Sequence, residues 1–506
     1  MVGRSRPGLL APNRPMHPDS RSRHVGTQRR RLSAILLVIF GSVAASVAAA
    51  DWEGARVERE MIHAITSKRA AADTYFGAAY SATHSGCRAA LVEGNDLDGF
   101  AVRVDGKLGA RYSEIALSTP VFSEDGSSVA YCALRRDGWC WVVNGVEETV
   151  FPAITATSFA FSANGKRHAY LVKPNLKRIT ESLLIVDGAP APKVQPDDPG
   201  PFDTAPVFSP DGSRLAFVEF RREGAVAAMR VNLDGKGGRW HGRGLAFNES
   251  LGFGRWVPSP RSLGPASAVG VQARPLVAGM GFSPDGRHFY QKAEIDGGYA
   301  VFVDDTTGPV YQNLGFDFTF APRTDPVDYA YLAESGSRHL LVRAKAAPII
   351  VANLADWTLT YSPDGRRLAF AGTRDGNKAI WVDGAAAACD VPIADFGNFR
   401  SIRFSPDSKR LAFTIQTKRQ VHWVVDGKAG PGTPATGPDF EFSPDSAHFA
   451  YSLVSEDGKG MALILDGRIR AIHPAVVAGP VFHQDGTLEY LTRSEEGLHR
   501  LRVSGY

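Results

Sequence analysis

The sequence is poor in cysteine and has little net charge. Its 506 residues include four cysteines and 22% charged residues, with a formal net charge of +4. So few cysteines exclude a small domain held together by many disulfides. A hydrophobic content of 44% excludes a wholly disordered chain, and the length requires several domains or a repeat architecture.

The motifs of common enzyme classes are also missing. The sequence contains no Gly-x-Ser-x-Gly nucleophile elbow, no His-Glu-x-x-His zinc motif, no P-loop and no Rossmann glycine fingerprint. Its thirteen histidines are scattered. We therefore expect no catalytic residue of a known motif, no metal and no other cofactor. Whether the protein is an enzyme stays open at this point, and a non-enzymatic function is favoured.

Arginine is concentrated at the N-terminus. Residues 1–50 hold eight arginines, no lysine and a single acid, Asp19. The remaining chain is mildly acidic, so the basic character of the whole comes from this segment. An acidic body argues against nucleic-acid binding, because that function needs a basic stripe.

Residues 1–50 resemble an export signal. Arg29, Arg30 and Arg31 precede an apolar run over 32–50, which ends in three alanines. A basic segment, an apolar segment and a small-residue cleavage site are the parts of a secretory signal. The alternative is an uncleaved anchor in the inner membrane, since the run is just long enough to span a bilayer. Both interpretations place 51–506 outside the cytoplasm, either periplasmic or secreted.

One short phrase recurs along the chain. It consists of an aromatic residue, Ser, Pro, Asp and then Gly or Ser, followed by an apolar-aromatic run. Clear, weak and degenerate copies begin at Tyr80, Phe122, Phe161, Phe208, Phe282, Phe320, Tyr361, Phe404, Phe442 and Phe482. The intervals lie between 38 and 47 residues, except for one of 74. A period near 40 residues is typical of four-stranded propeller blades.

A second phrase follows most copies and ends in Asp-Gly or Asn-Gly, as at Asp105, Asn144 and Asp426. These dipeptides between apolar strands favour a type I′ hairpin. Ser-Pro-Asp-Gly favours a tight turn, because Pro sets φ, Asp bonds to the backbone and Gly accepts positive φ. Each repeat therefore predicts two hairpins, whose strands a, b, c and d form one blade.

The phrase Phe-Ser-Pro-Asp-Gly…Leu-Ala-Phe resembles the WD40-like repeat of TolB-type bacterial β-propellers. The resemblance covers residues 75–506. It implies an all-β propeller of about ten four-stranded blades after the N-terminal export signal. Ten blades exceed the usual range of one ring. Two propellers and one large ring are therefore alternatives, with two slightly favoured. Such a fold hosts many functions, so the resemblance implies architecture rather than activity.

Three segments do not follow the repeat. Residues 237–278 are interpreted as an insertion, with a degenerate eleventh blade as the alternative. Residues 51–74 form a short N-terminal segment in which the spacing of Trp52, Val57, Met61 and Ile65 predicts a helix over 52–70. The last repeat reaches Tyr506 soon after its third strand. We expect residues 72–80 or the preceding segment to supply the missing strand, so that no sheet edge is left bare.

The variable loops are the expected binding elements. The tight a–b and c–d turns of every blade lie on one face, so the b–c loops and d–a connections lie on the other, where function is commonly carried. Arginine and tryptophan recur at binding hot spots. The candidate residues are Arg135, Arg136, Arg221, Arg222, Trp240, His241, Arg243, Arg255, Trp256 and Arg374. The alternative is that these charged loops are simply solvated.

Two cysteines flank one of these loops. Cys132 and Cys140 lie four residues on either side of Arg136, which would place them opposite each other across a hairpin. An oxidising compartment would then allow a disulfide. Cys87 and Cys389 belong to other blades and are expected to form no disulfide.

These observations favour an exported, non-enzymatic propeller that binds a protein, peptide or glycan partner, with no nucleic acid and no cofactor. One alternative is an extracytoplasmic hydrolase or lyase with its site in the central channel. Another is a membrane-tethered sensor or scaffold, in which residues 32–50 are retained.

Overall fold

The computed structural model describes most of the chain after residue 50. The described residues are 52, 55–64, 77–95, 97–117, 119–175, 182–191, 205–223, 226–239, 279–295, 297–352, 358–393, 402–417, 420–433, 436–455 and 458–506. The chain divides into two compact units, Met1–Ala48 and Ala49–Tyr506. All described residues belong to the second unit.

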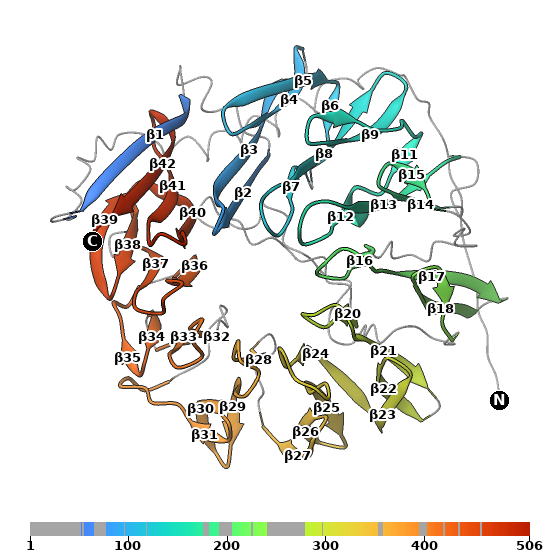
Figure 1. Ribbon diagram of the computed structural model, residues 1–506, viewed down its shortest axis with the longest axis vertical. Helices are drawn as coiled ribbons and strands as arrows, with labels where there is room; N and C mark the ends of the chain where they lie inside the picture. Colours follow the sequence, from blue (N-terminus) through green and yellow to red (C-terminus); the bar gives the residue numbers. More distant parts are fainter. Residues whose placement is uncertain are drawn as a thin grey trace, which may run out of the picture. The chain divides into compact units, whose positions relative to one another are not determined.

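Ten antiparallel sheets surround a common axis (Figure 1). Each is a meander of strands a to d, and strand a is innermost. Blades two and three split strand a into two short pieces. The part of the chain that the structure describes contains one short 3-10 helix, η1 (Ala156–Ser158), and otherwise only strands. The predicted all-β propeller of about ten four-stranded blades is therefore confirmed.

The strands of blades one to three are β2 (Gly77–Thr83), β3 (Gly86–Asn95), β4 (Gly99–Val104), β5 (Lys107–Tyr112); β6 (Glu114–Ile115), β7 (Val121–Phe122), β8 (Val129–Arg135), β9 (Gly138–Val143), β10 (Val146–Glu147); β11 (Ala153–Ile154), β12 (Ala160–Phe161), β13 (His168–Lys173), β14 (Leu183–Val186) and β15 (Ala189–Pro190). Blades four to seven comprise β16 (Val207–Phe208), β17 (Leu215–Glu223), β18 (Val226–Leu233), β19 (Lys236–Gly237); β20 (Met280–Phe282), β21 (Phe289–Ile295), β22 (Gly298–Val303), β23 (Thr306–Tyr311); β24 (Asn313–Phe320), β25 (Tyr329–Ser335), β26 (Arg338–Arg343), β27 (Ala346–Ile350); β28 (Thr360–Tyr361), β29 (Leu368–Arg374), β30 (Asn377–Val382) and β31 (Ala385–Ala386). Blades eight to ten comprise β32 (Ile402–Phe404), β33 (Leu411–Gln416), β34 (Val421–Val425), β35 (Lys428–Ala429); β36 (Thr436–Phe442), β37 (Phe449–Val454), β38 (Met461–Leu465), β39 (Arg468–His473); β40 (Ala475–Phe482), β41 (Leu488–Arg493), β42 (Gly497–Ser504) and β1 (Arg56–Ala64).

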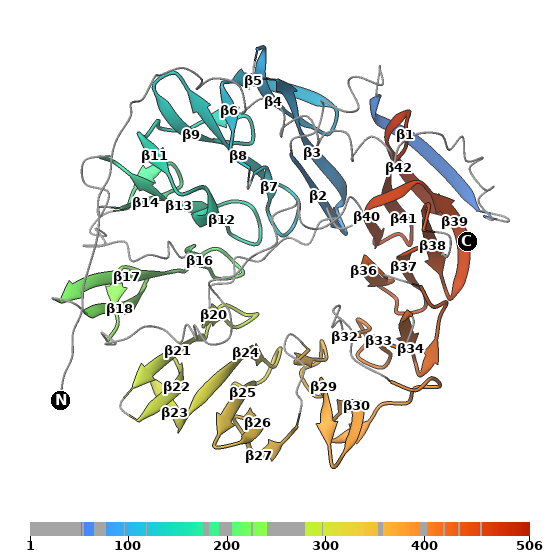
Figure 2. The same ribbon diagram turned by 180° about the vertical axis from the view of Figure 1, so that it is seen from behind.

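The blades form one ring, so the preference for two propellers is wrong. Each blade contacts the next, and β2 of blade one lies beside β40 of blade ten (Figure 2). Blades four and five are also in contact, because Arg214 of blade four donates to the carbonyl of Arg287 in blade five at 3.0 Å. The long connection between these two blades therefore does not interrupt the ring. Residues 240–278 of the proposed insertion lie outside the described residues.

The ring is closed by a strand from the other end of the sequence. β1 pairs antiparallel with β42, with Arg59 opposite Leu501, and becomes strand d of blade ten (Figure 1). This pairing covers an edge of β42 that would otherwise be bare. Of the two segments expected to supply this strand, residues 72–80 or the segment before them, the preceding segment does so, and Gly77–Thr83 form β2 of blade one.

The helix predicted over residues 52–70 is wrong for 56–64, which form β1. A spacing of four residues puts Val57 and Met61 on one face of a helix, but it also puts them on one face of a strand, because four is an even number. That face is exposed, at 41% for Val57 and 51% for Met61. The available edge of β42, rather than the local pattern, decides the conformation.

The turn phrases behave as their chemistry predicts. Asp105 has φ of 46° and Gly106 has φ of 83°, which is the backbone of a type I′ turn. In the a–b turn of blade four, Ser209 donates to Asp211 at 2.5 Å, and Asp211 accepts the amide of Ser213 at 3.1 Å. Hydrogen bonds from Ser209 and Ser213 lower the pKa of Asp211 to about 2, so its carboxylate stays ionised well below neutral pH.

Five blades share a contact that we call the arginine bridge. The arginine lies directly before strand b, or near its start in blade one, and binds the c–d turn aspartate of its own blade. It also donates to a carbonyl in the a–b turn of the next blade and lies over the leading phenylalanine of that blade. In blade eight, Arg410 lies 2.8 Å from Asp426 and 2.8 Å from the carbonyl of Ala447, and 5.3 Å from the Phe442 ring centre. The bridging residues are Arg88, Arg167, Arg214, Arg367 and Arg410.

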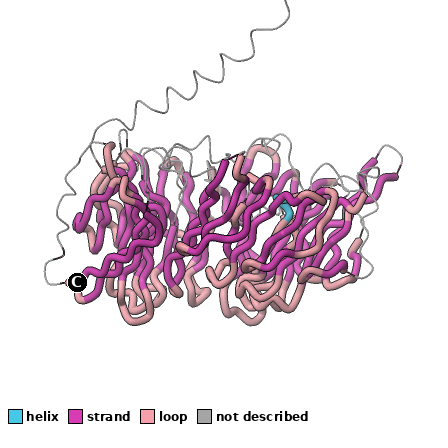
Figure 3. Tube along the Cα trace, turned by 90° about the horizontal axis from the view of Figure 1, so that it is seen from above, coloured by secondary structure: helices cyan, strands magenta, loops and turns pink. Residues whose placement is uncertain are grey.

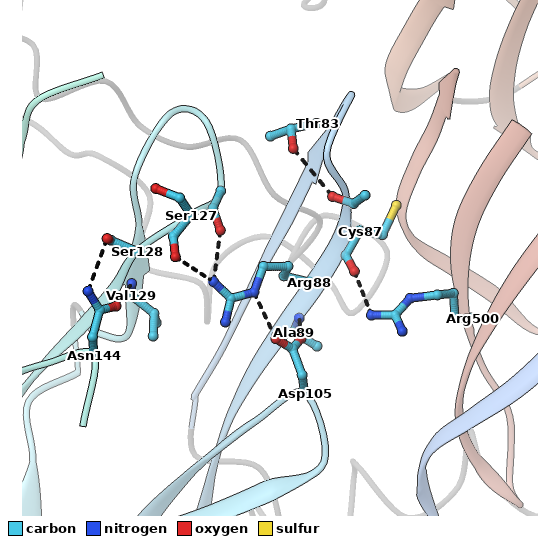
Figure 4. A network of polar contacts seen from close by, with 12 residues as sticks. Thr83, Cys87, Arg88, Ala89, Asp105, Ser127, Ser128, Val129, Asn144 and Arg500 are labelled. Atoms are coloured by element: carbon cyan, nitrogen blue, oxygen red, sulfur yellow. Dashed lines mark hydrogen bonds and ion pairs between the residues drawn. The ribbon is translucent and has the colours of Figure 1, made fainter. Parts of the chain in front are cut away.

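Figure 4 shows the bridge between blades one and two. Arg88 lies 2.7 Å from Asp105 and donates to the carbonyls of Gly126 and Ser127 at 2.8 and 3.1 Å. The other carboxylate oxygen of Asp105 accepts the amide of Ala89 at 2.9 Å. One aspartate therefore shapes its own turn, anchors strand b and orients the arginine toward the next blade.

Small residues allow the blades to pack closely. Strand b carries a fully buried alanine, with 0% exposure, as its second residue in seven blades and as its fifth residue in blade one: Ala90, Ala130, Ala169, Ala216, Ala330, Ala369, Ala412 and Ala450. The position faces the following blade, as the cluster of Ala216 with Met280 and Phe289 shows. Blade five instead has Tyr290, whose ring stacks on Phe318 of blade six at 3.7 Å. Blade ten has Glu489.

Glu489 joins blade ten to blade one. Its side chain has no exposed surface. It accepts the amide of Cys87 at 2.6 Å and lies 2.7 Å from Arg502, and His483 lies 3.1 Å away. Burial alone would raise the pKa of Glu489, but the Cys87 amide and the charge of Arg502 lower it, so the carboxylate stays ionised. This ionic contact occupies the position at which eight other blades have alanine.

Removing β1 tests the closure of the ring. We expect a protein of residues 65–506 to melt at least about 5 °C below one of residues 51–506, because β42 then becomes a bare edge. Differential scanning fluorimetry measures the difference. Both proteins lack residues 1–50, so the leader does not affect the comparison. Equal melting temperatures would contradict the closure by β1.

Replacing a bridging arginine tests the contact between blades. Arg410→Ala should lower the free energy of unfolding by about 2 kcal/mol, since it removes charge-assisted hydrogen bonds and a cation–π contact from a partly exposed site. Urea denaturation measures the loss. Arg366→Ala, in an exposed a–b turn position of blade seven, is the control and should change stability by less than about 0.5 kcal/mol. Similar losses in both variants would refute the bridge.

Candidate functional site

The propeller has two different faces. The a–b and c–d turns lie together on one face, which we call the turn face, because the arginine bridges join the two kinds of turn. The b–c loops and d–a connections lie on the opposite face, which we call the loop face. In a side view, described loops gather along one edge of the ring (Figure 3). Most blades repeat the same tight turns on the turn face, whereas the loop face differs from blade to blade.

Two of the predicted loop arginines bind within their own blade. Arg135 of blade two lies 3.1 Å from Asp137 and 2.6 Å from Glu147. Arg374 of blade seven donates to the carbonyl of Gly384 at 2.9 Å, and its guanidinium lies 4.7 Å from the centre of the Trp381 ring. These contacts fix the side chains and use part of their hydrogen-bonding capacity.

The structure describes only some of the remaining predicted binding residues. Arg136 is exposed at the tip of the loop between β8 and β9. Arg221 and Arg222 lie in β17, and only their backbone is described. Five further candidates lie outside the described residues: Trp240, His241, Arg243, Arg255 and Trp256. The described candidates belong to blades two, four and seven, so the structure does not bring them together.

The predicted Cys132–Cys140 disulfide is wrong. The loop has two central residues rather than one, so Cys132 lies opposite Trp141, and Cys140 lies opposite Ala133. Neighbouring residues of a strand point to opposite sides of the sheet. Cys132 therefore packs toward blade three and Cys140 toward blade one. Both are thiols, and burial raises their pKa values to about 12 and about 11.

A charged pair on the innermost strands was missed by the sequence analysis. Arg403 in β32 of blade eight is exposed, and Glu441 in β36 of blade nine is partly buried, with 32% of its side chain exposed. Each directly precedes the leading aromatic residue of its blade. Blades eight and nine are neighbours, and the positive charge of Arg403 favours the ionised form of the Glu441 carboxyl.

His84 from blade one completes this group. One ring nitrogen, Nδ1, donates to the carbonyl of Phe482 in blade ten at 2.7 Å. The other, Nε2, lies 3.5 Å from Glu441 Oε1. Because a carbonyl only accepts, Nδ1 carries a proton and Nε2 faces the carboxyl. Burial raises the pKa of Glu441, while the charges of His84 and Arg403 oppose this increase.

The repeat itself contains the signal that identifies these residues. The residue before each leading aromatic occupies the same place in all ten blades, and we call this set the inner wall. Its members are Ala79, Val121, Ala160, Val207, Gly281, Thr319, Thr360, Arg403, Glu441 and Val481. Charge occurs at two adjacent members only. Aligning the ten copies and searching for charge at otherwise small or apolar positions would have found them.

Two further findings concern the described residues. No group of three or more histidine, cysteine, aspartate or glutamate side chains among them is arranged to hold a metal ion. No helix in this part of the chain is long and apolar enough to cross a membrane. The apolar run over 32–50 lies outside it.

Comparisons with known proteins give likeness in fold only. No family model and no curated protein matches the sequence. Among solved structures, a eukaryotic initiation factor is 13% identical with a TM-score of 0.41, covering 72% of this chain and 89% of its own. TolB from Acinetobacter baumannii is 14% identical with a TM-score of 0.23, covering 59% and 77%.

A structure of prolyl endopeptidases is also similar. It is 13% identical with a TM-score of 0.30, covering 74% of this chain and 53% of its own. At such identities and scores, none of these proteins assigns an activity to this chain. What the structure establishes is a ten-blade propeller, a class that includes binding modules as well as enzymes.

Because Cys132 and Cys140 do not lie opposite each other, we expect all four cysteines to be free thiols. Denatured protein alkylated with iodoacetamide without a reductant should carry four adducts, one for each cysteine in the chain. Intact-mass spectrometry of residues 51–506 measures the number. A reduced sample is the control and should give the same mass. Two adducts before reduction and four after it would instead show that a disulfide forms.

Proposed function

We propose that this chain is an exported β-propeller that binds a protein, peptide or glycan partner through its loop face. The leader supports export, because its basic and apolar segments match a secretory signal. In the tethered alternative, residues 32–50 keep the propeller at the inner membrane. Intact-mass analysis of the native protein distinguishes the two, since cleavage would remove the first fifty residues.

The observation that carries the proposal is the difference between the two faces. On the turn face, eight of the ten blades have a c–d turn with an aspartate or asparagine at positive φ, and five blades form arginine bridges. The d–a connections of the loop face range from a single residue between β39 and β40 to forty-two residues between β19 and β20. Long connections on a rigid scaffold commonly carry binding function.

Affinity capture tests this proposal. Immobilised residues 51–506 should retain a partner from an extracytoplasmic extract, and the purified partner should bind saturably. Replacing residues 240–278 with a short Gly-Ser linker should abolish binding. The matched control replaces residues 192–204, another d–a connection, and should bind normally. Equal binding by both variants, or no partner at all, would contradict the proposal.

The enzyme alternative has its own test. The same protein is incubated with peptide and glycan libraries, and products are measured at several pH values. Saturable turnover that is lost in Glu441→Gln would favour a hydrolase or lyase acting at the inner wall. Partner binding without turnover supports the non-enzymatic function.

A further inference from the structure

We propose that the closure of the ring is acid-sensitive: protonation of His499 in β42 breaks its hydrogen bond with Arg59 in β1 and releases β1. The device lies at the pairing that joins the N-terminal strand to the last blade (Figure 1). It does not depend on a bound partner, so it goes beyond the proposed function and does not rest on it.

β1 is the least buried strand of blade ten. As the outermost strand it pairs with β42 on one side only, and none of its nine residues is buried. Its polar contacts include those of Arg59 and an ion pair of Glu60 with Arg500 at 2.7 Å. A strand with few buried contacts opens at a lower free energy than the core strands. A small change in its side-chain contacts can therefore release it.

The contact between Arg59 and His499 fixes the protonation state of the histidine. Nη2 of Arg59 lies 2.9 Å from Nε2 of His499. A guanidinium only donates, so Nε2 accepts and carries no proton. The proton of the neutral ring is therefore on Nδ1, which is buried and forms no hydrogen bond with any described residue. The hydrogen bond to β1 thus requires the neutral form of the ring.

Protonation replaces this attraction with repulsion. Nε2 would then carry a proton that faces another donor, and two positive charges would lie 2.9 Å apart. Solvent screens them little at His499, which is 2% exposed. When β1 leaves β42, Arg59 moves into water and the repulsion is removed.

The groups around His499 favour its neutral form in the closed ring. Burial and the charge of Arg59 lower the pKa of His499, and Glu496 in the loop between β41 and β42 opposes them. The side chain of Glu496 is 70% exposed, so solvent weakens its effect, and it already lies 3.0 Å from Arg59. From blade nine, His473 faces blade ten and hydrogen-bonds to Tyr490 at 3.1 Å. Burial and Arg59 lower the pKa of His473 to about 4, so it adds no positive charge near neutral pH.

Acid therefore favours the released strand. Without Arg59 beside it, the pKa of His499 moves back toward the ordinary histidine value of about 6.5. Because the pKa is lower in the closed ring, the released state binds the proton more readily, and closure is lost as the pH falls below about 6.5. One histidine can shift this equilibrium by at most about tenfold between pH 7.5 and 5.5. His63 of β1 adds to the effect, since burial and the charge of Arg103 lower its pKa.

Hydrogen–deuterium exchange of residues 51–506 at pH 7.5 and pH 5.5 tests the switch. Rates are corrected for the intrinsic effect of pH on amide exchange, so that only protection by structure is compared. We expect the protection of β1 and β42 to fall about fivefold or more at pH 5.5. β29 of blade seven, which contains no histidine, is the internal control and should change by less than about twofold.

Variants assign the effect to His499. His499→Gln keeps an oxygen that can accept from Arg59 but does not titrate. It should protect β1 normally at pH 7.5, and its loss of protection at pH 5.5 should be at most about half as large as that of the unchanged protein. His339→Gln, at an exposed histidine in β26 of blade six, is the matched control and should behave like the unchanged protein. Arg59→Ala lacks the hydrogen bond throughout, so its β1 should be poorly protected at both pH values.

Three results would overturn the inference: protection of β1 that does not change with pH, an equal loss in β1 and β29, or the same pH effect in His499→Gln as in the unchanged protein. If His499→Gln already releases β1 at pH 7.5, Arg59→Ala decides. A pH effect in Arg59→Ala as large as that of the unchanged protein contradicts the switch, and a smaller one supports it. Partner capture at pH 7.5 does not involve these measurements, so failure of the switch leaves the loop-face proposal standing.

Discussion

The ring depends on an arginine that contacts two blades at once. In blades one, three, four, seven and eight it binds the aspartate of its own c–d turn and the a–b turn carbonyl of the following blade. The aspartate must also have positive φ, 46° at Asp105, so that its carboxylate points back to strand b. Turn geometry and contact between blades are therefore set by the same residue. This explains why both turn phrases recur together along the chain.

Where the arginine is missing, other chemistry replaces it. His288 lies 2.7 Å from Asp304 in blade five, and His448 lies 2.6 Å from Asp466 in blade nine. Tyr506 packs against His448 and donates to the Gly486 carbonyl, which fills the contact between blades nine and ten. Buried Glu489 completes the ring. The most irregular contacts thus gather where the two ends of the propeller meet.

Local chemistry made the blades predictable, and long-range contacts made the rest unpredictable. Proline, aspartate and glycine act within a turn, so the hairpins and the number of blades followed from the repeat. The pairing of β1 with β42 joins residues more than 400 apart, and a spacing that also suits a helix concealed it. The predicted pairing of Cys132 with Cys140 was wrong because the loop between β8 and β9 has two central residues instead of one. Arg403 and Glu441 stand out only when all ten copies are compared.

The central claim is that a single arginine couples neighbouring blades. Hydrogen–deuterium exchange of Arg167→Ala, followed by mass spectrometry, tests it most directly. The account predicts faster exchange in the a–b turn of blade four, where Arg167 donates to the Gly212 carbonyl at 3.0 Å, and in β13. Exchange around Arg410, on a distant part of the ring, should stay unchanged. Unchanged exchange at blade four, or equal acceleration throughout the ring, would contradict the claim.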